Sequence, residues 1–196
     1  INAKTAGIWM SYGQMDQALI KNCTINSDNI GIYCATFGGN ISERDVDSSK
    51  NVKSTAAAVF YNNKVTAENT ALEIKSGSVE IIGGKYTSNN YEADASHVGS
   101  SGSGAGVATI VINNKYCGSG NANGVSVNIA DAEISNTGNT KAPVLVITAP
   151  GVSGKDVSLT MDKNYGVEIG LGAKSTASGA TASKMSATVT DAISIS

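Results

Sequence analysis

Three lysines stand at equivalent places in a recurring sequence motif, and together they could bind an anionic ligand. Lys64, Lys85 and Lys115 each directly precede the second apolar residue of the motif. If the motif repeats on neighbouring strands, their ammonium groups form a row that suits an acidic polysaccharide. Tyr61 and Tyr91 are candidates for exposed rings that stack on sugars. The alternative is a solvated polar face on which lysines deter aggregation at sheet edges.

Acidic side chains and the single histidine are further candidates for chemistry. Alternate strand positions would put Glu43, Asp45 and Asp47 on one face, where their oxygens could hold calcium, but no glycine-rich calcium repeat accompanies them. His97 lies among serines in a Gly/Ser-rich segment and is a candidate contact residue in a loop. A catalytic triad would also need an orienting acid and an oxyanion hole. No phosphate loop, zinc spacing or dinucleotide fingerprint is present, so we expect no enzyme, no metal and no cofactor.

The recurring motif is an apolar residue followed five places later by another apolar residue. Successive copies start 18 to 31 residues apart, and most start 18 to 21 apart, which is typical of a solenoid. Two residues five apart on one strand face opposite ways, so both can face inward only if the chain bends between them. Asn-Asn or Gly-Gly, which accept such a bend, occupy this place in three copies. The motif occurs at Ile20/Ile25, Ile41/Val46, Phe60/Val65, Ile81/Tyr86, Val111/Tyr116, Ile129/Ile134 and Thr160/Tyr165.

A second bend and a further short strand complete the repeat. Asn29, Asn69, Asn90 and Gly120 each stand four places after the second apolar residue, and strand-like segments such as ALEI at 71–74 follow. We therefore predict an all-β fold, a parallel β-helix (solenoid) of about seven coils of roughly 18–24 residues with two inserted loops. A β-sandwich of short strands is the alternative. The inward column of the predicted solenoid contains Ile25, Val46, Val65, Tyr86, Tyr116 and Ile134.

The repeat also predicts how the chain is organised. We expect a single domain over residues 1–196, with regular coils over 18–171. Trp9 is expected as an aromatic plug over the end of the core. Solenoid ends need covers that prevent end-to-end pairing. Four segments depart from the repeat: a first coil or cap at 1–19, inserted loops at 91–105 and 148–156, and an irregular last coil or cap at 172–196.

Composition narrows the function classes. The net charge of −2 and the 15% of charged residues argue against nucleic-acid binding, which needs a basic surface. No segment approaches about 18 consecutive apolar residues, so we expect no membrane span. Three cysteines are too few for a disulfide scaffold. Cys34 falls in the column of Ile74 and is expected to be a buried thiol, and a Cys23–Cys34 bridge is the alternative.

Two strand-like segments carry a resemblance to a known family. GIYC at 31–34 and GSVEII at 77–82, with Asn at the bends, resemble coils of the right-handed parallel β-helix of the pectin-lyase-like superfamily, above all those of bacterial surface and autotransporter adhesin passenger domains. The resemblance covers roughly residues 18–171 and implies the right-handedness. Enzymes of that superfamily use aspartate clusters with Arg, Lys or His on one face, whereas Arg44 and His97 lie far apart here.

The resemblance therefore implies a non-enzymatic, extracellular or cell-surface segment. It would be an adhesin or structural shaft that contacts a host or cell-surface protein or polysaccharide, with the two inserted loops as contact points. One alternative is a carbohydrate-binding or carbohydrate-active β-helix that uses the lysine row. The other is a self-assembling filament subunit that associates through the solenoid ends.

Overall fold

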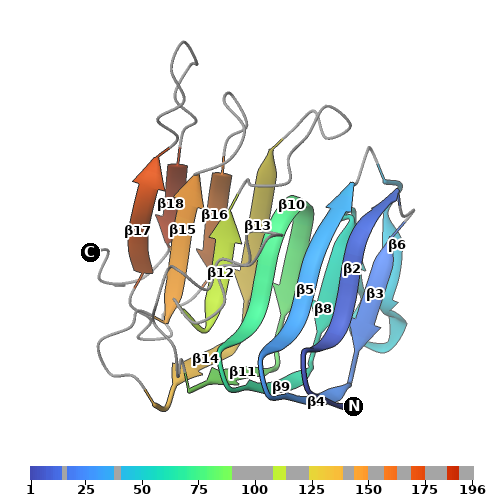
Figure 1. Cartoon of the computed structure of the whole chain (residues 1–196). Helices are drawn as coiled ribbons and strands as arrows, with labels where there is room; N and C mark the ends of the chain where they lie inside the picture. The colour runs from blue at the N-terminus through green and yellow to red at the C-terminus, as the bar shows by residue number, and fades with distance from the viewer. Residues whose placement is uncertain are drawn as a thin grey trace.

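The computed structural model describes nine segments of the chain, and these segments are almost entirely β-strand (Figure 1). One 3-10 helix, η1 (Ser48–Lys50), is the only helix among the described residues. Every strand pairing in them is parallel except one hairpin, so the alternative of an antiparallel sandwich is not supported. The described segments are residues 1–14, 17–37, 41–89, 108–113, 124–138, 144–149, 157–162, 169–174 and 185–189.

The first sheet has five short parallel strands that lie along the base of the molecule in Figure 1. Its longer strands have four residues each, and alternate residues in them are buried and exposed. One side of this sheet therefore faces the core and the other faces solvent. In spatial order the strands are β1 (Asn2–Ala3), β4 (Thr24–Ser27), β9 (Lys64–Ala67), β11 (Lys85–Ser88) and β14 (Glu133–Asn136).

The second sheet is a curled parallel sheet of eleven strands, in which β10 (Thr70–Ile82) belongs to two arms. The first half of β10 pairs with β5 and β12, and the second half pairs with β8 and β13. Gly77 stands between the halves with a φ of 83°, where a side chain would be strained. The first arm contains β2 (Ala6–Gln14), β5 (Ile30–Phe37), β10, β12 (Ile110–Asn113), β15 (Leu145–Ala149) and β17 (Ile169–Lys174); the second contains β3 (Ala18–Lys21), β8 (Ala58–Tyr61), β10, β13 (Val125–Ala130), β16 (Val157–Asp162) and β18 (Met185–Val189).

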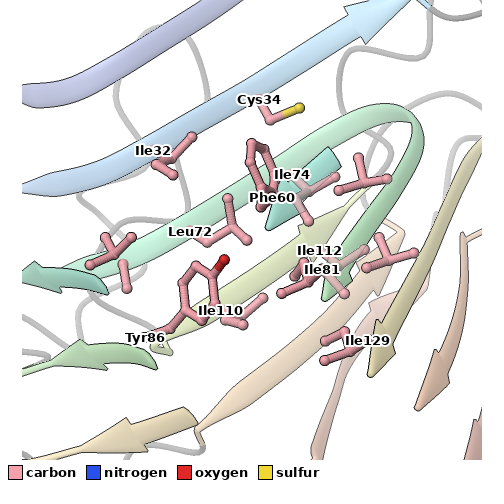
Figure 2. Close-up of a cluster of buried hydrophobic side chains, with 14 of the residues drawn as sticks. Ile32, Cys34, Phe60, Leu72, Ile74, Ile81, Tyr86, Ile110, Ile112 and Ile129 are labelled. Atoms are coloured by element: carbon pink, nitrogen blue, oxygen red, sulfur yellow. The ribbon is translucent and has the colours of Figure 1, made fainter. Parts of the chain in front are cut away.

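The core lies between the five-stranded sheet and the two arms of the curled sheet (Figure 2). Tyr86 is fully buried, as predicted, and burial raises the pKa of its phenol, which stays protonated. Cys34 is a buried thiol in register with Ile74, also as predicted, and Cys23 is likewise a thiol, so the two are not bridged. The core residues stack in columns: Ile25, Val65, Tyr86 and Ile134 from the first sheet, Ile32, Leu72 and Ile110 from the first arm, and Phe60, Ile81 and Ile129 from the second.

The predicted Asn and Gly bends form a stack of left-handed turns between the second arm and the first sheet. Asn22, Asn62, Gly83 and Asp131 have φ angles of 54°, 49°, 63° and 57°. The first three turns each donate a backbone hydrogen bond to the next layer, from Asn22 N to Tyr61 O (3.0 Å), Asn62 N to Ile82 O (2.8 Å) and Gly83 N to Ala130 O (2.7 Å). The residue types at these turns are those that tolerate this backbone region.

The predicted coil that contains Ile41 and Val46 is wrong. Strands β6 (Arg44–Asp47) and β7 (Val52–Ser54) form an antiparallel hairpin that reverses through η1 and Asn51, whose φ is 52°. Val46 is buried, but it packs with Val59 and Tyr61 in a separate cluster and not in the main core. Ile25 therefore pairs directly with Val65, and Val46 is absent from the column.

The predicted end segments at 1–19 and 172–196 carry strands of the two sheets, and the predicted segments lie partly outside the described residues. The described part of residues 1–19 continues both sheets, because β1 pairs with β4 and β2 pairs with β5. Strand β17 extends to Lys174 and β18 pairs with β16, so part of the 172–196 segment continues the curled sheet. The start of the 148–156 loop belongs to β15, and the rest of it, like the 91–105 loop, lies outside the described residues.

Candidate functional site

The predicted lysine row lies on the solvent side of the five-stranded sheet, with a different composition from the one expected. Lys64 and Lys85 are exposed and in register, as predicted. The next residue in the row is Glu133, whose Oε1 accepts a hydrogen bond from Lys85 Nζ at 2.6 Å. Glu133 thus occupies the place expected of Lys115, which lies outside the described residues. Asp45, expected between Thr24 and Lys64, belongs to the hairpin instead. Among the described residues Lys85 therefore has an ion-pair partner and Lys64 has none.

A second row of hydrogen-bonding side chains runs beside the lysine row, two residues further along each strand. Asn26 Nδ2 donates to Asn2 Oδ1 at 2.9 Å, and the hydroxyls of Thr87 and Ser135 lie 3.2 Å apart. These side chains hydrogen-bond from strand to strand and present an ordered array to solvent. The row, called here the hydroxyl–amide row, contains Asn2, Asn26, Thr66, Thr87 and Ser135.

A third row, called here the end row, follows where the strands of this sheet end. Glu68 Oε2 accepts from Asn89 Nδ2 at 2.8 Å, and Asn89 Oδ1 accepts from Thr137 Oγ1 at 2.7 Å. Backbone hydrogen bonds hold the row in place, for example from Glu68 N to Ser27 O at 3.0 Å. The end row contains Lys4, Asp28, Glu68, Asn89 and Thr137, and the three rows together form the polar face.

The polar face is hollowed at its N-terminal end. An open groove of about 390 Å³ crosses β1, β4 and β9 and is lined by two amides, two hydroxyls, one ammonium group and two carboxylates. A groove of this chemistry can donate and accept many hydrogen bonds, as a ligand rich in hydroxyl groups requires. Its lining is Asn2, Ala3, Lys4, Asn26, Ser27, Asp28, Thr66 and Glu68.

Tyr61 is not the exposed ring that the sequence predicted. It is buried, and its hydroxyl donates a hydrogen bond to Asp47 Oδ2 at 2.7 Å, which ties the hairpin to the second arm. Hydrogen bonds from Ser49 and Tyr61 lower the pKa of Asp47, while the hydrogen bond to Asp47 raises the pKa of Tyr61. The pair is therefore a structural clasp and not a sugar-stacking ring.

The three candidate calcium ligands do not converge. Glu43 forms an ion pair with Lys53 at 3.3 Å, and Asp45 lies opposite Lys53 in the backbone register of the hairpin. Asp47 is displaced by an irregularity in the hairpin register and is engaged with Tyr61. The described residues contain no group of three or more His, Cys, Asp or Glu that could hold a metal ion. His97 and Tyr91 lie outside the described part of the chain.

Trp9 does not lie over the end of the core, where the sequence analysis expected it. Its neighbours in β2, Ile8 and Met10, face the core, so Trp9 faces away from it and does not plug its end. Its ring stacks on that of Tyr33, with centroids 3.9 Å apart and planes 7° apart. The signal was present in the sequence, since GIWM at 7–10 and GIYC at 31–34 are two copies of one strand.

A buried ion pair lies beside this aromatic stack. Lys75 Nζ lies 2.9 Å from Glu73 Oε1, both side chains are 0% exposed, and Lys75 Nζ is 5.4 Å from the Tyr33 ring centroid. Alternation alone would have placed these charges on a solvated surface. Their burial shows that the outer side of the first arm is not simply a second polar face.

Comparisons with protein families, curated proteins and solved structures give no match to this chain. In the described residues no helix is long and apolar enough to cross a membrane. The function therefore has to be inferred from the surfaces of the molecule itself.

Proposed function

We propose that this chain is a segment of a parallel β-helix, of the right-handed pectin-lyase-like type that its strands resemble. The support is the order of the strands along the sequence. Each strand of the five-stranded sheet is followed by a strand of the first arm and then by a strand of the second arm. The shortest sequence separation between residues that pair in adjacent parallel strands is 21 residues, as between Lys64 and Lys85. Parallel strands with such short connections are typical of solenoid coils.

The proposed function is to present the polar face as a binding surface on the outside of a bacterial cell. The segment acts as an adhesin or shaft, without catalysis, and its partner is a host or cell-surface protein or polysaccharide. The observation that carries this proposal is the continuity of the three polar rows across the five strands. A surface built on stacked strands keeps its groups in fixed positions before binding, which reduces the entropy lost on association.

Carbohydrate binding is the second candidate function, and the groove at the N-terminal end of the polar face favours it. Its carboxylates and amides can satisfy the hydroxyls of a sugar chain. Lys64, exposed and without an ion pair in the described structure, can attract an acidic group. An extended polysaccharide that lies across the strands would meet successive groups of each row about 4.8 Å apart.

Binding to immobilised polysaccharides and to intact cells tests both functions. The polar-face variant combines Lys64→Ser, Asn26→Ala and Thr66→Ala, and the matched control combines Ser126→Ala and Asn128→Ala, which are exposed polar positions on β13. We expect the polar-face variant to raise the Kd at least about tenfold, equivalent to about 1.4 kcal/mol, and the control to bind normally.

The nature of the surface separates the two candidates. Loss of binding to acidic or neutral polysaccharides identifies a carbohydrate-binding face, and no new reducing ends should appear in the product. If the polar-face variant loses binding only to cells, and protease treatment of the cells abolishes binding of the wild type, the polar face belongs to a protein-binding adhesin. Equal binding by both variants would show that the polar face is not the binding surface.

A further inference from the structure

Two oppositely charged side chains lie fully buried on the outer side of the first arm. Glu73 and Lys75 stand two residues apart on β10, and Lys75 Nζ lies 2.9 Å from Glu73 Oε1, with both side chains 0% exposed. Burying charges is costly, and replacing a buried ion pair by apolar residues often leaves stability unchanged or improves it. This pair is therefore a candidate for chemistry and not only for stability.

A buried asparagine occupies the neighbouring strand at the same level. Strands β10 and β12 lie side by side in parallel, with Ile74 opposite Ile112 (Figure 1). The next residues of these strands are Lys75 and Asn113, and Asn113 is 3% exposed. The two isoleucines face the core, so by the alternation of side chains Lys75 and Asn113 lie on the outer side of the arm, as Glu73 does. Adjacent strands are about 4.8 Å apart, a gap that the flexible four-carbon stem of a lysine can cross.

Apolar and aromatic groups surround the buried pair. Lys75 Nζ is 5.4 Å from the ring centroid of Tyr33, on which the ring of Trp9 stacks. Val111, opposite Glu73 on β12, is fully buried. Such surroundings favour uncharged forms. Moving one proton from Lys75 Nζ to Glu73 Oε1 converts the ion pair into a neutral carboxylic acid and a neutral amine, and the neutral amine is the nucleophile.

We propose that Lys75 and Asn113 form an intramolecular amide bond, with Glu73 as the acid–base catalyst. The neutral Nζ attacks Cγ of Asn113 while the acid form of Glu73 donates a hydrogen bond to the carbonyl oxygen. Glu73 then gives its proton to Nδ2 and takes one from Nζ, the Cγ–Nδ2 bond breaks, and ammonia leaves. The new bond joins Nζ to Cγ, and Glu73 ends protonated, so the site ends uncharged. No oxidant, reductant or cofactor takes part.

The bond has a structural consequence for the first arm. It replaces two buried charges by a neutral amide and ties β10 covalently to β12, which hydrogen bonds otherwise hold together. A cross-link between distant positions of the sequence stabilises the fold by restricting the unfolded chain. The reaction uses no residue of the polar face or of the groove, so it is independent of the proposed binding function.

Intact mass and peptide mapping of the purified chain test the proposal. The wild type should be lighter than its sequence by one ammonia. Trypsin cuts after lysine but not after an acylated lysine, so residues 65–85 and 86–115 should emerge as one branched peptide in which Lys75 is joined to Asn113. Glu73→Gln should keep the full mass of its sequence. Asn113→Asp should reach the same final mass as the wild type, because it loses water to give the same product.

The matched control is Glu133→Gln, which removes the carboxylate of the exposed ion pair with Lys85 and should lose ammonia as the wild type does. Lys75→Arg keeps a cation beside Glu73 and should keep its full mass. Circular dichroism of each variant verifies that it is folded. A wild type with the full mass of its sequence would overturn the proposal, whatever the variants do. So would a loss of ammonia that maps to other residues or persists in Glu73→Gln, or a loss of water that joins Lys75 to Glu73.

Discussion

Two adjacent glycines should respond very differently to substitution, because they occupy different parts of the same turn. Gly84 has a φ of 91°, and a Cβ added there would lie 2.4 Å from the backbone oxygen of Asn63. That oxygen accepts the hydrogen bond from Lys85 N at 2.7 Å, which joins two layers of the five-stranded sheet. Strain at such a backbone position costs about 1–3 kcal/mol, and losing the hydrogen bond adds about 1 kcal/mol. Gly84→Ala should therefore destabilise the protein by about 3 kcal/mol, with a small offset from the less flexible unfolded chain.

Gly83 provides the matched control for this prediction. Its φ of 63° is close to those of Asn22 and Asn62 in the neighbouring turns, and the nearest atom to an added Cβ is 4.0 Å away. Gly83→Asn should therefore change the stability by no more than about 0.5 kcal/mol. In thermal unfolding we expect Gly84→Ala to lower the Tm by roughly 6–12 °C and Gly83→Asn to leave it nearly unchanged. Equal Tm losses for the two variants, or none for Gly84→Ala, would refute the turn geometry.

Two further predictions concern the core and the hairpin. Val65→Asp buries a carboxylate in a fully buried column and should lower the free energy of unfolding by about 4 kcal/mol or more. Thr66→Asp, on the exposed side of the same strand, should lower it little. Similar urea midpoints for the two variants would contradict the column assignment. Asp47 has a lowered pKa in the folded protein, so its contribution is present above the ordinary pKa of about 4 and is lost as the pH falls through the lowered value. The pKa of Tyr61 is raised instead, so its contribution to stability has the opposite pH dependence. It is present below the ordinary pKa of about 10 and is lost as the pH rises through the raised value. The stability difference between wild type and Tyr61→Phe should therefore be largest at neutral pH and shrink at both extremes, and a difference independent of pH would argue against the clasp.

The parts of the fold that sequence could predict are those set by local backbone chemistry. Asn-Asn and Gly-Gly in the middle of an apolar motif required a bend, and the structure has left-handed turns at Asn62 and Gly83. The same reasoning put Val65 and Tyr86 in one inward column and Lys64 beside Lys85 on the opposite side. These inferences succeed because the two-residue alternation of a strand leaves few choices once the bend is placed.

Stacking order could not be predicted, because it depends on which segments leave the sheets. The apolar spacing of Ile41 and Val46 matches the motif, yet the turn at η1 and Asn51 reverses the chain into a hairpin. That hairpin buries Val46 against Val59 instead, so spacing alone could not separate a coil from an excursion. In the lysine row, Lys64 and Lys85 pair as predicted, the next strand in the sheet carries Glu133, and Lys115 lies outside the described residues.

The turns that hold the core columns also hold the candidate binding surface in register. Lys64 and Lys85 each follow a left-handed turn directly, and their backbone N–H groups bond to Cys23 O and Asn63 O of the preceding layers, at 2.8 and 2.7 Å. The spacing of the lysine row is therefore set by the turns and not by contacts among its side chains. Gly84→Ala disturbs the bond that positions Lys85 and leaves every side chain of the polar face intact. If the polar face recognises its partner through the register of its rows, this variant should weaken binding at temperatures where it is still folded, and Gly83→Asn should bind as the wild type does.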